Sequence, residues 1–174
     1  MGIEPRFHVV EKDGPVVIWK FNNPPQNLMN LETAAEFTEL VEEFEADPEL
    51  RVGIITSNLP HVFIQHFDVS TILNEWSSMT PEEMEARREE AAKNPPPKRG
   101  LRRLRRKPVI AAINAQTAGG GCELTLMCEF RFMSRYATLG CPEVNAGILP
   151  GGGGTQRMTR LLGLSKAMGM LLLG

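Results

Sequence analysis

The sequence has no long hydrophobic run, few aromatic residues and almost no net charge. It contains no stretch of about 18 uncharged apolar residues, so no membrane span is predicted. Its first segment, "MGIEPRFHVV", also lacks the long apolar core of a secretory signal. A formal net charge of −2 and a pI near 6.0 predict no bulk attraction to nucleic acid or to a membrane surface. We therefore expect a cytoplasmic protein without nucleic-acid or membrane partners.

Cysteine is scarce, and its spacing indicates no metal site. Cys122, Cys128 and Cys141 form no CxxC pair and lack the spacing of zinc ligands, so we expect reduced thiols and no bound metal. Apolar residues make up 42% and charged residues 23% of the chain, which is ordinary globular usage. The 174 residues therefore fit one core domain over residues 1–174.

Strand-like and helix-like segments alternate along the first half of the chain. The segment "FHVVEKDGPVVIWKFN" predicts a hairpin that turns at Asp13-Gly14. Residues 31–47 carry apolar side chains at helical spacing, which predicts an amphipathic helix. Those side chains are Leu31, Ala34, Ala35, Phe37, Leu40, Val41 and Phe44. The runs "VGIITS" and "PVIAAIN" are typical of buried strands, and this order predicts an α/β fold with crossover connections.

A charged region follows the first strands and helix. In "TPEEMEARREEAAKN", Thr80 is a candidate N-cap, Pro81 is the first helical residue and Glu83 completes a capping box. The next segment, "KRGLRRLRRK", could be a patch that binds phosphate or nucleic acid. We favour the solvated face of a short helix whose Leu101 and Leu104 point inward, because the whole chain is slightly acidic.

Residues 118–123 read "AGGGCE", which places three glycines after the strand "PVIAAIN" and before a helix that continues through "CELTLMC". Unpaired N–H groups at such a helix N-terminus attract an anion. The anion could be a bound phosphate or an oxyanion that develops during a reaction. We favour the oxyanion, because the segment lacks the Lys and Ser/Thr of a P-loop.

Two carboxylates lie in glycine-rich surroundings. Glu123 is in the first turn after the glycine triplet, where an acid could simply complement the helix dipole. Glu143 follows a proline in "LGCPEVNAGILPGGGG". Partial burial of such a pair would raise at least one pKa, which suits acid and base roles. In "HVFIQHFDVSTI", Asp68 can cap a helix and His66 could be a base, although a lone loop histidine is more often exposed or hydrogen-bonded.

These segments, in this order, resemble the crotonase or enoyl-CoA hydratase/isomerase superfamily. The resemblance is strongest in "KPVIAAINAQTAGGGCELTLMCEFRF" and "LGCPEVNAGILPGGGGTQRMTRLLG", and it extends more weakly back to the N-terminal hairpin. It implies a fold of repeated ββα units and an acyl-CoA thioester substrate. It further implies an oxyanion hole formed by the N–H groups of Gly120 and Phe67, and catalysis by Glu123 and Glu143 on a water held by the Gly151 amide.

The resemblance also implies a set of substrate contacts, no cofactor beyond coenzyme A in the substrate, and assembly as a homotrimer or hexamer. The expected substrate contacts are Asn27, Leu28, Gln65, His66, Asp68, Val69, Gly119 and Gly151. Hydration of a 2-enoyl-CoA in fatty acid metabolism is the favoured function, since both glutamates are retained. Isomerisation, thioester hydrolysis and a non-catalytic acyl-CoA-binding remnant stay open as alternatives.

Two departures from the family pattern qualify these expectations. The turn "QHFD" stands where many relatives have a small "AGAD" turn, so we expect Phe67 and His66 to reshape the acyl end of the pocket. The chain stops at "MGMLLLG", where relatives continue into a helical region that builds trimers. We therefore expect this chain to lack that region, and its apolar end to be a surface on which something packs.

Overall fold

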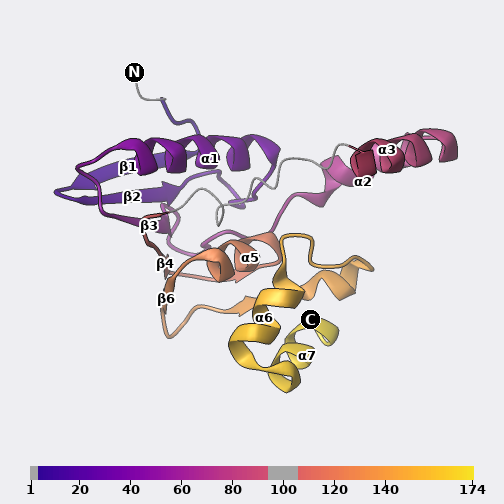
Figure 1. Ribbon diagram of the computed structural model, residues 1–174. Coiled ribbons are helices and arrows are strands. Elements are labelled where there is room, and N and C mark those ends of the chain that lie inside the picture. Colours follow the sequence, from indigo (N-terminus) through magenta and orange to yellow (C-terminus); the bar gives the residue numbers. More distant parts are fainter. Residues whose placement is uncertain (1–3, 94–105) are drawn as a thin grey trace.

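A five-stranded sheet forms the centre of the protein. The computed structural model describes residues 4–93 and 106–174 (Figure 1). The strand order in the sheet is β1-β2-β3-β4-β6, with β1 antiparallel to β2 and every later pair parallel. These strands are β1 (His8–Asp13), β2 (Val16–Phe21), β3 (Val52–Ser57), β4 (Val109–Ile113) and β6 (Phe130–Met133). The predicted α/β class is confirmed.

The predicted N-terminal hairpin is present, with its turn one residue later than expected. Asp13 still belongs to β1 and pairs with Val16, so the turn consists of Gly14 and Pro15. Gly14 has a φ of 52°, a conformation that glycine adopts without steric cost. Its neighbour Pro15 has no N–H to donate, which suits a turn better than a ladder.

The apolar run "VGIITS" predicted a strand that is buried on both sides, but only one side of this strand is fully buried. Along β3 the burial alternates, with Gly53 and Ile55 buried and their neighbours half-buried. Gly53 is in contact with Trp19 of β2, whose ring occupies the space that a Cβ would fill. The sheet therefore has one fully packed face, on which the indole lies directly against the backbone of β3.

Helix α1 (Leu31–Ala46) covers that packed face with Phe37, Leu40, Val41 and Phe44. It begins at Asn30, whose side chain accepts a hydrogen bond from the Thr33 N–H, while the Thr33 hydroxyl accepts from Asn30 N–H. The predicted helix is confirmed, but Leu31 does not face the core and is 66% exposed. Thr33 is fully buried instead, because its hydroxyl is held in the cap.

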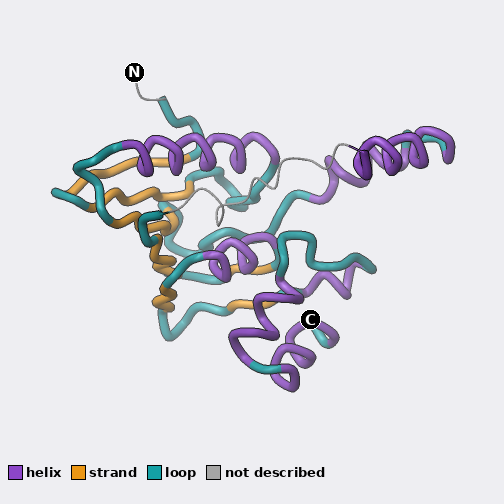
Figure 2. Tube along the Cα trace, viewed as in Figure 1, coloured by secondary structure: helices purple, strands orange, loops and turns teal. Residues whose placement is uncertain are grey.

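Helices α2 (Val69–Ser77) and α3 (Pro81–Lys93) extend away from the sheet (Figures 1 and 2). The predicted capping box of α3 is confirmed, since Thr80 N–H donates to Glu83 at 2.7 Å and Glu83 N–H donates back to the Thr80 hydroxyl at 3.2 Å. The predicted short helix in "KRGLRRLRRK", with Leu101 and Leu104, lies outside the described residues apart from its last two.

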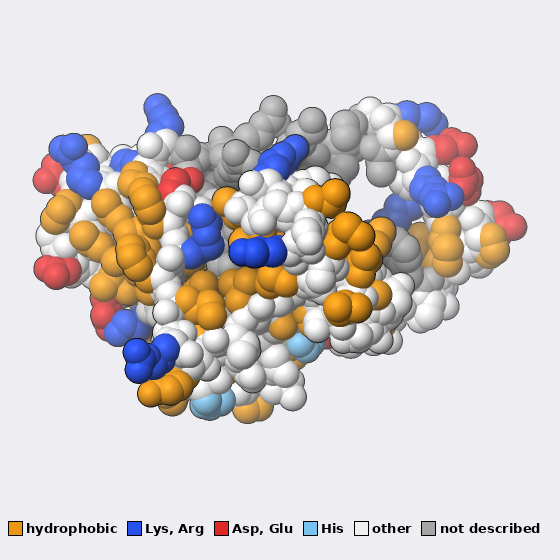
Figure 3. All heavy atoms as spheres, turned by 90° about the horizontal axis from the view of Figure 1, so that it is seen from below, with side chains coloured by type: hydrophobic (Ala, Val, Ile, Leu, Met, Phe, Trp, Pro, Cys, Tyr) orange, Lys and Arg blue, Asp and Glu red, His pale blue; other side chains and the backbone are white. Residues whose placement is uncertain are grey.

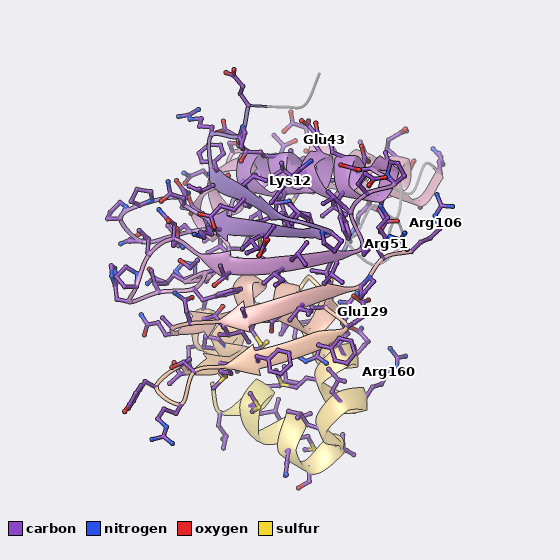
Figure 4. All side chains as sticks on the ribbon, turned by 90° about the vertical axis from the view of Figure 1, so that its left-hand side faces the viewer. Lys12, Glu43, Arg51, Arg106, Glu129 and Arg160 are labelled. Carbon is purple, nitrogen blue, oxygen red and sulfur yellow. The ribbon has the colours of Figure 1, made fainter. Side chains whose placement is uncertain are left out.

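The C-terminal part packs a second, smaller core beyond β6 (Figures 1 and 4). It contains β5 (Thr117–Ala118), α5 (Gly120–Met127), β7 (Leu139–Gly140), the 3-10 helix η1 (Pro142–Ala146), α6 (Gly154–Leu162) and α7 (Leu164–Leu172). β5 and β7 pair in parallel as a separate two-stranded sheet. The core between these elements consists of Cys122, Leu126, Cys141, Met158 and Ala167.

All three cysteines are buried and form no disulfide among the described residues, in agreement with the expected reduced thiols. A hydrogen bond with Cys141 and burial raise the pKa of the Cys122 thiol far above its ordinary value, and both cysteines pack in the second core. Within residues 4–93 and 106–174, no helix is both long and apolar enough to cross a membrane.

Candidate active site

Three segments that are distant in sequence run side by side at the centre of the candidate site. Residues 62–68 lie between residues 27–29 and residues 116–118. On one side, Met29 N–H donates to the His66 carbonyl at 2.9 Å, and Asp68 N–H donates to the Met29 carbonyl at 2.7 Å. On the other side, Ala118 N–H donates to the Gln65 carbonyl at 3.0 Å. These backbone contacts bring Phe67 against the start of α5.

The glycine triplet at the start of α5 has a separate physical reason at each position. Gly119 precedes the helix with a φ of 50°, which a side chain would make strained. A Cβ on Gly121 would lie 2.5 Å from the Ile64 carbonyl oxygen, closer than real Cβ contacts allow. A Cβ on Gly120 would lie 2.9 Å from Phe67 Cβ and 3.3 Å from Phe67 N. The triplet therefore lets the backbone of α5 meet the backbone at residues 64–67.

Gly120 and Phe67 bring two unused backbone donors close together. Gly120 is the first residue of α5, so its N–H has no partner four residues earlier within the helix. Phe67 forms a parallel bridge with Met29, but the hydrogen bonds of that bridge use the neighbouring residues His66 and Asp68. Neither N–H donates to another described residue. Two adjacent donors of this kind can bind an oxygen that carries negative charge.

Glu123 is held by the loop that precedes α6. The residue is 4% exposed, and its carboxylate accepts hydrogen bonds from Gly152 N–H at 2.8 Å and from Gly154 N–H at 2.7 Å. A Cβ on Gly152 would lie 2.6 Å from Glu123 Oε2, so only glycine permits this approach. One loop therefore supplies a donor to each oxygen of the carboxylate.

Glu143, in the first turn of η1, lies close to Gly119. Its Oε1 is 3.2 Å from the point that a Cβ on Gly119 would occupy, and His66 Cβ is 3.5 Å from the same point. Its Oε2 is buried and has no hydrogen-bond partner among the residues described. Burial, with a smaller contribution from the charge of Glu123, raises the pKa of Glu143, while a hydrogen bond from its own backbone and, to a smaller extent, His66 oppose this rise.

His66 is half-buried, and its Nδ1 lies 2.8 Å from the Phe67 carbonyl oxygen. The nearby residue Asp68 caps α2, because its Oδ1 accepts from Ser70 N–H at 3.0 Å. Hydrogen bonds from the Ser70 hydroxyl and N–H lower the pKa of Asp68. The side chains of His66 and Asp68 thus both have partners within two residues along the chain. His66 also lies close enough to Glu143 to affect its pKa.

The other expected contact residues differ in how accessible they are. Leu28, Gln65 and Val69 are half-buried around Phe67. Asn27 is fully buried, and its amide nitrogen donates to Ser57 Oγ at 2.9 Å and to the Phe63 carbonyl at 2.6 Å. Its side chain therefore has no exposed polar atom, and it fixes residues 27–29 to the backbone at Phe63. Gly151 is exposed, and the loop N–H groups that bind Glu123 belong to Gly152 and Gly154.

Sequence reasoning did not assign Gly152 and Gly154 as partners of Glu123. The second glycine run was visible in the sequence, and the start of α6 at its last glycine was the signal that its amides were available. No group of three or more His, Cys, Asp or Glu side chains in the described part of the chain could hold a metal ion.

Comparisons with known proteins agree with this architecture. The family model for enoyl-CoA hydratase/isomerase matches residues 11–174. The chain is 37% identical over 162 residues to a short-chain-enoyl-CoA hydratase of Clostridium acetobutylicum, covering 91% of this chain and 58% of that protein. It is 35% identical over 164 residues to a crotonyl-CoA hydratase of Syntrophomonas wolfei, covering 94% of this chain and 60% of that protein.

A solved structure of an enoyl-CoA hydratase subunit I from Geobacillus kaustophilus superposes with a TM-score of 0.79 at 31% identity, covering 97% of this chain and 62% of that one. The chain thus spans less than two thirds of the length of these relatives. The match over nearly all of its residues, on the same fold, shows that the chain belongs to the enoyl-CoA hydratase/isomerase family and has the crotonase fold.

Proposed function

We propose that this chain carries the chemistry of an enoyl-CoA hydratase, the addition of water across the 2,3 double bond of a 2-enoyl-CoA thioester. One observation supports this function above the others. The two unused N–H groups of Gly120 and Phe67 lie close together, Glu143 lies beside the adjacent Gly119, and Glu123 is in the first turn of α5. Such a site offers a charge-stabilising pair of donors together with two carboxyl groups.

In this proposal the thioester carbonyl oxygen accepts hydrogen bonds from Gly120 N–H and Phe67 N–H. Attack of water at C3 turns the thioester into an enolate, whose negative charge develops on that oxygen. Both donors are backbone groups at the junction of two tightly packed segments, so they need little rearrangement as the charge develops. A donor of this kind typically contributes ~10²–10³ in rate.

The two carboxyl groups divide the proton transfers. The raised pKa of Glu143 favours its protonated form, so Glu143 donates its proton to C2. Both oxygens of Glu123 accept hydrogen bonds, which suits the ionised acceptor that takes a proton from the attacking water. The hydroxide adds to C3, and transfer of a proton from Glu123 to Glu143 through water restores the starting state. This step uses only the thioester and water.

The substrate contacts expected at Leu28, Gln65, His66 and Val69 belong to the same proposal. The names of the relatives from Clostridium and Syntrophomonas, which refer to short-chain and crotonyl substrates, favour a short acyl chain. The proposal also includes assembly of the whole protein into a homotrimer or hexamer, and a site of action in the cytoplasm.

Turnover of crotonyl-CoA by this chain, followed as loss of the absorbance of the conjugated thioester, tests the function. We expect Glu123→Gln and Glu143→Gln each to lower kcat/KM by about 10²–10⁴-fold, since each removes a positioned acid or base. The matched control is Glu42→Gln, a carboxylate on the exposed face of α1, which should keep the rate of the unchanged chain.

Further measurements on the same variants and substrates distinguish the alternative functions. Full activity in both glutamine variants would contradict the two-carboxylate mechanism. Release of free CoA would indicate thioester hydrolysis, and conversion of a 3-enoyl-CoA would indicate isomerisation. Binding of crotonyl-CoA without turnover, measured by calorimetry, would leave a non-catalytic binding protein. Absence of both binding and turnover would contradict every acyl-CoA function for this chain.

A further inference from the structure

The carboxylate of Glu123 depends on a loop that has little rigidity of its own. Residues 151–154 are four consecutive glycines, and glycine loses more conformational freedom on folding than any other residue. Gly152 and Gly154 must nevertheless present their N–H groups to the two oxygens of one buried carboxylate. Some contact outside the loop has to hold this backbone in place.

Arg157, in the first turns of α6, makes that contact. Its Nη1 donates a hydrogen bond to the Gly152 carbonyl. Its Cζ lies 3.2 Å from the point that a Cβ on Gly153 would occupy, so the guanidinium covers the loop at this residue. Gly153 has a φ of 92° and ends the loop, and its carbonyl accepts from Arg157 N–H at 3.0 Å. The arginine therefore holds the loop through both its side chain and its backbone.

The position of this hydrogen bond within the loop is important. The Gly152 carbonyl belongs to the peptide group between residues 152 and 153. This peptide group lies between the two that carry the N–H groups of Gly152 and Gly154. Rotation of the central peptide would therefore move one or both donors away from Glu123.

We propose that Arg157 is a positioning residue for Glu123, which it orients by holding the Gly152 carbonyl and thereby the two amides that bind the carboxylate. This role rests on the proposed function of Glu123 as the group that receives a proton from water. Arg157 does not touch the reacting atoms in this account. It acts through the loop, by its hydrogen bond to the Gly152 carbonyl.

Three variants test the role by steady-state kinetics. We expect Arg157→Met to lower kcat by about 10–100-fold with little change in KM, because a displaced catalytic group costs rate rather than binding. Arg157→Lys should recover part of the loss, since an ammonium can donate one hydrogen bond to the same carbonyl. Arg160→Met is the matched control, because Arg160 is on the same helix and points outward (Figure 4).

Amide hydrogen exchange, measured by NMR, tests the same role without catalysis. We expect exchange at Gly152 and Gly154 to speed up by at least about 10-fold in Arg157→Met, and to match the unchanged chain in Arg160→Met. Where Arg157→Met does not fold, Arg157→Lys gives the comparison, with a smaller acceleration at the same two amides.

The outcomes distinguish this inference from the proposed function. Unchanged exchange at the two glycines, or acceleration spread evenly over the whole chain, would overturn the positioning role. An inactive but correctly folded unchanged chain would contradict the proposed function, while the exchange data would still decide whether Arg157 holds the loop. Equal kcat for Arg157→Met and the unchanged chain would also overturn the inference.

Discussion

At the scale of single residues, the absence of side chains is what shapes the candidate site. Gly120 permits the approach of Phe67, and Gly152 permits the approach of the Glu123 carboxylate. At Gly152 the backbone N–H binds Glu123, and at Gly120 it is the proposed oxyanion donor; in both places a Cβ would occupy the space that the neighbouring residue needs. The resemblance placed the oxyanion hole at Gly120 and Phe67, and this role stays a proposal. The structure explains why the first of these positions has to be glycine.

The first prediction at this scale concerns Gly120→Ala. Its Cβ would lie 2.9 Å from Phe67 Cβ, so the two N–H donors must separate. We expect kcat for crotonyl-CoA to fall by about 10²-fold or more, as for loss of one oxyanion donor. We expect denaturant titration to show a loss of about 1–3 kcal/mol in unfolding free energy, which is typical of overpacking.

Gly169→Ala is the control for that substitution. Gly169 lies within α7, has no positive φ, and a Cβ there would meet no atom within 4 Å. Alanine should therefore stabilise the helix by about 0.5–1 kcal/mol and leave the rate unchanged. A Gly120→Ala variant that keeps full activity would argue against an oxyanion at this position.

At the scale of elements, one ionisable pair joins the start of the sheet to α1. His8 of β1 is buried, and its Nδ1 lies 2.7 Å from Glu36 Oε1 of α1. Burial lowers the pKa of His8 despite its carboxylate partner, and its Nε2 has no partner among the residues described. Burial alone would raise the pKa of Glu36, but hydrogen bonds from His8, Arg6 and Phe7 outweigh it and lower this pKa.

The second prediction follows from the direction of the His8 shift. A histidine whose pKa is lowered in the folded state binds fewer protons there than in the unfolded chain. Its contribution to stability is therefore complete above the ordinary pKa of 6.5 and is lost as the pH falls toward the lowered pKa. We expect the unfolding free energy to decrease between about pH 7 and about pH 5, measured by denaturant titration.

His8→Gln supplies the comparison, because glutamine does not titrate in this range and should flatten the decrease. His61 is exposed and provides the control, since His61→Gln should reproduce the pH dependence of the unchanged chain. If the unfolding free energy of His8→Gln changes with pH as steeply as that of the unchanged chain, the decrease is not caused by His8. Because the pKa of Glu36 is also lowered, the unfolding free energy should decrease further as the pH falls below its ordinary pKa of 4.5.

At the scale of the whole molecule, the C-terminal helices present an apolar surface. Large hydrophobic side chains are exposed on α6 and α7, and Figure 3 shows such side chains on the face that carries these helices. The C-terminal apolar surface comprises Leu161, Leu162, Leu164, Met168, Leu172 and Leu173, of which Leu173 is 80% exposed. Adjacent exposed apolar groups of this kind are typical of interfaces.

The third prediction is that this surface binds the fluorescent dye ANS. Leu164→Gln and Leu172→Gln together should lower ANS fluorescence, because both leucines are more than half exposed within the surface. The unfolding free energy should change by no more than about 0.5 kcal/mol, as for substitutions outside the core. Leu31→Gln on α1 is the control, since Leu31 is equally exposed but lies elsewhere. Unchanged fluorescence in the double variant would contradict the prediction.

Most of the fold could be predicted from local sequence patterns. The helix at residues 31–46, the capping box at Thr80 and the strands "VGIITS" and "PVIAAIN" depend on side-chain period and on caps within a few residues. Two details differed from the expectations. Thr33 of the helix cap is buried while Leu31 is exposed, which apolar spacing alone did not predict. Strand β3 is half-covered because α1 packs on one face of the sheet, which is a tertiary contact.

The candidate site divides in the same way. Glycine runs beside Glu123 and Glu143 are local features, and their order along the chain carried the family resemblance that the comparisons confirm. Which amides bind Glu123 is decided by hydrogen bonds across 29 and 31 residues. The raised pKa of Glu143 likewise depends on burial and on the charge of Glu123, which only the folded chain brings near.

The sequence by itself determined the elements and the candidate groups, because propensity, capping and spacing act over a few residues. Only the tertiary structure decided which donor faces which carboxylate, because packing brings together groups that the chain keeps far apart.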